Sequence, residues 1–171
     1  LEPLAALITL QKAEKPIEAY AEEYVHLEKE VKSVKEAIDG AKDIIAESVS
    51  DEADYRSWIR KATVQHGKVI SQAKDEKAES VYEMYYDFEE PVTKLAGHRV
   101  LALNRGEKEK FLTVKIEAPQ DDILRYLEKK MIHSDNPHTT PILKEVAEDS
   151  YKRLIAPAIE REIRNELTEK A

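Results

Sequence analysis

The sequence predicts a mainly α-helical fold, an irregular multi-helix bundle that carries at most a small two-stranded β-ribbon. The composition favours helix, because only four glycines occur in 171 residues and Ala, Glu, Lys, Leu and Ile are abundant. Apolar residues also recur at helical spacing along most of the chain. A chain of this length can bury an ordinary hydrophobic core, so we expect a folded protein and not a disordered one.

Apolar spacing predicts four helices in the first part of the chain, over about 3–10, 16–25, 34–49 and 51–66. Ser33, followed three residues later by Glu36, is typical of a capping box at the start of the third helix. We expect Ser50 to cap the fourth helix and Gly67 to end it. Trp58 shares the apolar face of that fourth helix, which favours a role as a core anchor over one as a stacking platform.

The middle of the chain is less regular. Apolar and polar residues alternate from Phe111 to Glu117, which predicts a strand, and residues 69–73 are its candidate partner. The apolar block before Asn104-Arg105-Gly106 is expected to stop at a glycine turn. The resulting parts are an N-terminal helical part (1–74), an irregular segment with a short helix and a strand (75–118), and C-terminal helices (119–171).

Helical spacing returns in the last third of the chain. Pro119 opens one predicted helix, residues 133–140 form a loop, and Thr140-Pro141 begins a further helical stretch. Pro157 lacks a backbone donor, so we expect a kink or a break near it. Glu160 and Arg164 have the i,i+4 spacing of an ion pair on an exposed helix.

Composition excludes several classes of function. The net charge of −8 and the pI of about 5.3 describe an acidic surface, which repels phosphate, so any contact with nucleic acid must come from a local basic patch. The chain has no cysteine, which suits a reducing cytoplasm. Its apolar runs are shorter than a membrane span and it shows no signal peptide, so we expect no membrane partner.

No catalytic constellation is evident in the sequence. It contains neither a glycine-rich phosphate loop nor a serine nucleophile elbow, so we expect no enzyme activity, no catalytic residues and no cofactor. His133, Asp135 and His138 offer two imidazoles and a carboxylate to a divalent ion. One local cluster supplies too few ligands, which favours a polar turn between two helices, and we expect no metal site.

One short segment is basic against this acidic background, and its Arg, Lys and Asn side chains suit phosphate oxygens or base edges. Glu107 and Glu109 dilute its charge. The alternative is structural, with Arg99 and Arg105 bridging carboxylates on neighbouring helices. The candidate nucleic-acid contacts are His98, Arg99, Asn104, Arg105, Lys108 and Lys110.

A cluster of aromatic residues lies just before this segment, in the sequence YEMYYDF. If its four aromatic side chains are exposed, they form a docking surface for a protein partner. If they are buried, they belong to the core. The residues concerned are Tyr82, Tyr85, Tyr86 and Phe88.

Two long stretches, YEMYYDFEEPVTKLAGHRVLALNRGEKE and SYKRLIAPAIEREIRNELTEKA, closely resemble the central region of the Tex family of bacterial transcription accessory proteins. The resemblance covers nearly the whole chain. It implies a helical core with helix-turn-helix character within a larger protein that also has a YqgF-like domain, helix-hairpin-helix elements and an OB-fold RNA-binding domain. The first residue, Leu1, and the helical pattern at the end of the chain agree with a piece of such a protein.

From this resemblance we expect a helical scaffold segment of a nucleic-acid-binding transcription accessory protein, which positions the YqgF-like and OB-fold domains outside this chain. RNA or DNA is the expected partner of the full-length protein. Binding by this acidic segment alone should be weak, since the family binds nucleic acid mainly through the OB-fold domain. The alternative is a module that docks RNA polymerase or another transcription protein.

Overall fold

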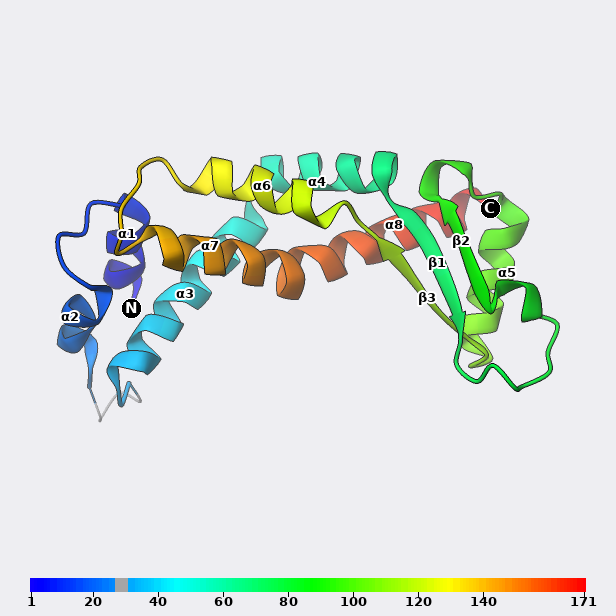
Figure 1. Cartoon of the computed structure of the whole chain (residues 1–171), viewed down its shortest axis with the longest axis horizontal. Helices are drawn as coiled ribbons and strands as arrows, with labels where there is room; N and C mark the ends of the chain where they lie inside the picture. The colour runs from blue at the N-terminus through cyan, green and yellow to red at the C-terminus, as the bar shows by residue number, and fades with distance from the viewer. Residues whose placement is uncertain (27–30) are drawn as a thin grey trace. The chain divides into compact units, whose positions relative to one another are not determined.

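The computed structural model describes residues 1–26 and 31–171, and these residues form two compact units (Figure 1). Unit 1 comprises Leu1–Arg56 and Asp121–Ala156, and unit 2 comprises Ser57–Gln120 and Pro157–Ala171. Helix dominates the described residues, so the prediction of a mainly α fold is confirmed.

Unit 1 is a group of helices built around α3. Alanines at 37, 41 and 46 are fully buried on α3 and let its neighbours approach closely. One neighbour adds a polar contact, because the Ser150 hydroxyl donates to the Ala46 carbonyl at 2.7 Å. The elements of this unit are α1 (Glu2–Leu10), α2 (Ile17–Ala21), the 3₁₀ turn η1 (Glu22–Tyr24), α3 (Val34–Asp51), α6 (Gln120–Met131), α7 (Thr140–Asp149) and the π-helical turn η5 (Ser150–Ile155).

The start of α3 agrees with the predicted capping box. The Ser33 hydroxyl accepts from the Glu36 amide at 3.1 Å, and the Glu36 carboxylate accepts from the Lys32 amide at 2.7 Å. The predicted role of Ser50 is wrong. Ser50 lies in the last turn of α3 and donates to the Glu47 carbonyl, while α4 (Ala53–His66) begins three residues later.

The loop between α6 and α7 is a polar turn, as predicted. Gln11 holds it, since its side chain donates to the Met131 carbonyl at 2.7 Å and accepts from the His133 and Ser134 amides. Asn136 orders the rest, because its Oδ1 accepts from the amides of the two residues before α7.

Unit 2 carries a three-stranded antiparallel sheet in the order β2-β1-β3. The predicted pairing of β1 (Lys68–Ala73) with β3 (Leu112–Glu117) is confirmed. The limit of two strands is wrong, because β2 (Asp87–Pro91) pairs with the other side of β1. Its sequence, DFEEP, does not predict a strand, because Asp, Glu and Pro are all depleted in strands. Figure 1 shows β2 and β3 on either side of β1.

Short elements and two longer helices complete unit 2: η3 (Glu83–Tyr85), η4 (Val92–Lys94), α5 (Gly97–Lys108), α8 (Ala156–Lys170) and the end of α4. Gly67 ends α4 as predicted, and a residue with a Cβ would not fit at this position. A Cβ on Gly67 would overlap the Thr63 carbonyl oxygen and lie 3.1 Å from the Glu117 carbonyl oxygen. The prediction of Trp58 as a core anchor is wrong, because the residue is 39% exposed.

Pro157 does not break the helical backbone. It is the second residue of α8, and the expected irregularity takes the form of η5, which ends two residues earlier and in which the hydrogen-bonding pattern widens to that of a π-helix. Proline has no N–H to donate to the carbonyl four residues earlier, and its ring collides with that carbonyl. A π-helical turn is a known way to accommodate such a defect.

Candidate nucleic-acid interface

Helix α5 carries five of the six candidate contacts. Its inner side is formed by Val100, Leu103 and Gly106, which are all buried. Gly106 was expected to form a turn, but it lies inside the helix. A Cβ there would overlap the Leu112 side chain and lie 3.2 Å from the Tyr82 ring, so the glycine allows α5 to approach β3 closely.

The turn comes four residues later, at Lys110. Lys110 has a φ of 68°, in the left-handed region. The Phe111 amide donates to the Gly106 carbonyl at 2.9 Å and the Lys110 amide to the Glu107 carbonyl at 3.1 Å. This pair of hydrogen bonds is a Schellman motif, in which the left-handed position is usually glycine. A lysine therefore occupies a position that favours a residue without a Cβ.

The outer side of α5 presents a basic stripe. Residues 98, 101, 105 and 108 follow 3-4-3 spacing, so they share one face of the helix, and all four are exposed. Among the described residues, none of the three cations at 105, 108 and 110 forms an ion pair. We use the name basic stripe for His98, Arg105 and Lys108 of this face together with Lys110, which follows the end of the helix; all four are exposed.

The other two candidates are engaged within the protein. The Arg99 guanidinium lies 5.5 Å from the centroid of the Phe88 ring, a cation–π contact. Asn104 uses both ends of its amide, since Nδ2 donates to Thr168 Oγ1 and Oδ1 accepts from Arg164, each at 2.9 Å. We therefore leave both residues out of the basic stripe.

The two glutamates that dilute the charge of this segment also have partners. Glu107 accepts from Arg164 at 2.8 Å, which neutralises its charge. Glu109 accepts a hydrogen bond from the Tyr82 hydroxyl. That hydrogen bond, together with burial, raises the pKa of Tyr82 above its usual value of 10.0. Dilution of the stripe's positive charge is thus reduced at Glu107, while the neutral Tyr82 hydroxyl brings no positive charge to Glu109.

The contact between α8 and the rest of unit 2 was not predicted. The expected Glu160–Arg164 pair does not form; instead Glu160 accepts from the Ile116 amide at 2.9 Å, and Arg164 reaches α5. Helical spacing within one segment gives no sign of such long-range partners. The structural alternative, in which Arg99 and Arg105 bridge carboxylates, is wrong for the described residues. Arg99 lies over the Phe88 ring, and the cation that pairs with a carboxylate of α5 is Arg164.

The aromatic cluster is mostly part of the core. Tyr82 and Tyr85 are only 6% and 4% exposed. Tyr85 packs edge-on against Phe88 with centroids 5.2 Å apart, and the half-buried Tyr86 donates to the Ala78 carbonyl at 2.8 Å. The hypothesis that these aromatics form an exposed docking surface is therefore wrong for the two buried tyrosines.

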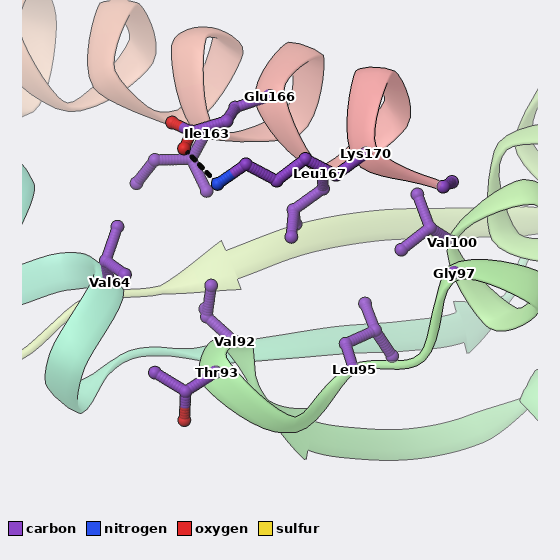
Figure 2. Close-up of a pocket in the computed structure, with 11 residues that line it drawn as sticks. Val64, Val92, Thr93, Leu95, Gly97, Val100, Ile163, Glu166, Leu167 and Lys170 are labelled. Atoms are coloured by element: carbon purple, nitrogen blue, oxygen red, sulfur yellow. Dashed lines mark hydrogen bonds and ion pairs between the residues drawn. The ribbon is translucent and has the colours of Figure 1, made fainter.

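A different hollow in unit 2 is open to solvent. It has a volume of about 280 Å³ and an apolar lining contributed by α4, η4, α5 and α8. Figure 2 shows Leu167 pointing from α8 toward the segment that carries Val92 and Leu95. Above it, Lys170 pairs with Glu166 at 2.7 Å. Such a hollow is large enough for an apolar side chain of a partner.

The part of the chain that the structure describes offers neither a metal cluster nor a membrane span. No group of three or more His, Asp or Glu residues is placed to hold a metal ion there. No helix in the same residues is long and apolar enough to cross a membrane.

Comparison with known proteins supplies the family. Residues 11–171 match the family described as Tex central region-like. The chain is 53% identical over its whole length to the uncharacterized protein YdcI of Bacillus subtilis, of which it covers 24%. It is 29% identical to the transcriptional accessory protein Tex of Neisseria gonorrhoeae over 71% of the chain and 16% of that protein. It is 30% identical to the human S1 RNA-binding domain-containing protein 1 over 77% of the chain and 15% of that protein.

The chain thus spans about a quarter or less of these relatives. The resemblance to Tex is confirmed by a match that covers nearly all of the sequence. This protein belongs to the Tex central region-like family.

Proposed function

We propose that this chain is a helical scaffold segment of a nucleic-acid-associated transcription accessory protein, and that its basic stripe contacts the RNA or DNA backbone. One observation carries the second part. Arg105, Lys108 and Lys110 are exposed and without ion pairs among the described residues, while neighbouring carboxylates are engaged by Arg164 and Tyr82. Two exposed cations on one face of α5 and a third just past the end of that helix suit a row of phosphates.

The scaffold role is supported by the family and by the helices themselves. One relative is named a transcriptional accessory protein and another an S1 RNA-binding domain-containing protein, and both are several times longer than this chain. A segment with a net charge of −8 is a poor nucleic-acid binder by itself. We therefore propose that the affinity for nucleic acid lies mainly in other parts of the full-length protein, which this segment positions relative to one another. We place that protein in the cytoplasm.

We also propose that this segment carries out no catalysis. Polar side chains of unit 2 form hydrogen bonds within the protein: Glu160 accepts from the Ile116 amide, and Asn104 donates to Thr168. Incubating the isolated chain with labelled RNA and DNA tests this directly. Nuclease activity that co-purifies with the chain and is lost with a point substitution in it would contradict the proposal.

The stripe is tested by affinity measurements on the full-length protein. Replacing Arg105, Lys108 and Lys110 with Ala should weaken RNA or DNA binding about equally for all base sequences, because phosphate contacts carry no sequence information. The matched control removes three exposed lysines of unit 1, which form no ion pair among the described residues: Lys12, Lys129 and Lys144. Equal losses in the two variants would contradict a specific role for the stripe.

The second candidate function is docking of a transcription protein such as RNA polymerase. The open apolar hollow beside Leu95 and Leu167 favours it, because such hollows accept the anchoring side chains of partners. A Leu95→Glu variant of the full-length protein should then lose co-purification with polymerase while keeping its affinity for nucleic acid. Unchanged co-purification would exclude this surface.

A further inference from the structure

The sheet of unit 2 has two edges, and the protein closes one of them. Along β3, the Ile116 amide donates to Glu160 Oε1 at 2.9 Å, and the Val114 carbonyl accepts from Arg164 Nη1 at 3.5 Å. Side chains of α8 thus occupy outward-facing backbone groups of this edge strand. Covering an edge in this way prevents it from pairing with another chain.

The other edge, β2, is left open. The Val92 amide donates to the Gly67 carbonyl, and the Ala73 amide donates to the Tyr86 carbonyl, so even-numbered residues of this strand point their backbone groups toward β1. The backbone groups of Asp87 and Glu89 therefore point away from the sheet. No side chain of the described residues forms a hydrogen bond with them.

The charge of this edge restricts what can pair with it. Asp87 and Glu89 are exposed and Glu90 is half-buried. Two cations lie near the strand: Lys68, 3.6 Å from Glu89, and Arg99, whose guanidinium lies over the Phe88 ring. A second copy of β2 would bring like charges together, and a phosphate backbone would be repelled as well. An extended segment with basic side chains would meet opposite charge.

We propose that the edge of β2 accepts an extended basic segment of a partner protein as a fourth strand. The N–H and C=O groups of Asp87 and Glu89 would form the new ladder. Lys or Arg side chains opposite these two residues would meet their carboxylates, and an apolar residue opposite Phe88 would contact its half-buried ring. The segment should therefore alternate basic and apolar residues. This surface is separate from the basic stripe and does not depend on it.

The probe is a blocked peptide of about six residues that alternates Lys and Val, the length of an ordinary strand. Added to the ¹⁵N-labelled chain, it should shift the NMR signals of the Asp87 and Glu89 amides and slow their hydrogen exchange. The same peptide with the backbone nitrogens of two adjacent central residues methylated, which removes an inward N–H in either strand direction and keeps the charge, should do neither. A peptide that alternates Glu and Val should also do neither. Shifts confined to other residues, or no binding, would overturn the proposal.

Two variants at one position separate backbone pairing from charge. Glu89→Gln removes the charge and keeps the amide. Glu89→Pro removes the charge and the outward N–H, and it spares the pairing with β1 because that N–H faces away from the sheet. Peptide affinity should be about fivefold lower for Glu89→Pro than for Glu89→Gln. Equal affinities would show that the peptide binds by charge alone and would overturn strand addition.

Folding of the proline variant is checked by its amide spectrum. If that spectrum differs from the wild type beyond β2, the exchange measurement on the unsubstituted chain decides. Protection of both the Asp87 and the Glu89 amide by the Lys-Val peptide supports the fourth strand. Protection of neither amide contradicts it.

Discussion

Arg164 forms an ion pair with Glu107 at 2.8 Å, although 57 residues separate them in the sequence. The same guanidinium donates to Asn104 Oδ1 at 2.9 Å, and only 20% of its side chain is exposed. One residue of α8 thus fastens two positions of α5, the helix that carries the basic stripe.

Replacing Arg164 with Ala should therefore destabilise unit 2. Loss of the guanidinium leaves the half-buried Glu107 without its partner, which should lower the free energy of unfolding by about 1–3 kcal/mol. Urea denaturation measures this change. The matched control is Arg161→Ala on the exposed side of the same helix, with little expected effect. Equal destabilisation by the two substitutions would contradict a fastening role for Arg164.

Two glycines inside helices should respond to alanine in opposite ways. Gly106→Ala forces a Cβ against Leu112 and should cost about 1–3 kcal/mol of stability. Gly40→Ala in α3 meets only the far end of the Leu1 side chain, which can rotate away. Its helix should gain about 0.5–1 kcal/mol. Chemical denaturation of both variants checks the pair, and a stable Gly106→Ala protein would argue against the close contact of α5 with β3.

Lys110 should show a conflict between stability and binding. Glycine at this left-handed position relieves the strain on Cβ, so Lys110→Gly should raise the free energy of unfolding by about 1 kcal/mol. The same change removes a cation of the stripe and should weaken nucleic-acid binding by the full-length protein. Lys108→Gly, inside the helix, should lower both quantities. A Lys110→Gly variant that is more stable and binds unchanged would remove Lys110 from the stripe.

The Tyr82–Glu109 hydrogen bond should make stability depend on alkaline pH. A phenol whose pKa is raised in the folded state stabilises the protein below its unfolded pKa of 10.0, and this contribution is lost as the pH rises through the folded value. Tyr82→Phe lacks that contribution. The stability difference between wild type and variant should therefore be constant below pH 10 and shrink above it. A difference that stays constant at higher pH would show that the hydrogen bond contributes nothing.

Local patterns in the sequence predicted most of the helices and the pairing of β1 with β3, because each depends on periodicity within a short segment. Ser33 capped its helix as expected. The errors arose where tertiary contacts decide. Gly106 is a packing residue and not a turn, since its neighbours Leu112 and Tyr82 come from other segments. The strand β2 has an unfavourable composition and forms because β1 offers it a partner.

The candidate site was predicted in location but not in detail. The sequence placed a basic segment between His98 and Lys110, and four of its six candidates are exposed. No local pattern shows that the Asn104 amide is hydrogen-bonded to Thr168 of α8, or that Glu107 forms an ion pair with Arg164 of the same helix. Both facts depend on Arg164 and Thr168, which lie some sixty residues further along the chain.

The salt dependence of RNA binding tests the central claim most directly. For a full-length protein that contains this segment, the logarithm of the affinity is measured against the logarithm of the salt concentration. If Arg105, Lys108 and Lys110 each neutralise a phosphate of a single strand, replacing all three with Ala should reduce the slope by about 2. The control variant at Lys12, Lys129 and Lys144 should keep the wild-type slope. A wild-type slope in the stripe variant would contradict the assignment of the basic stripe to nucleic acid.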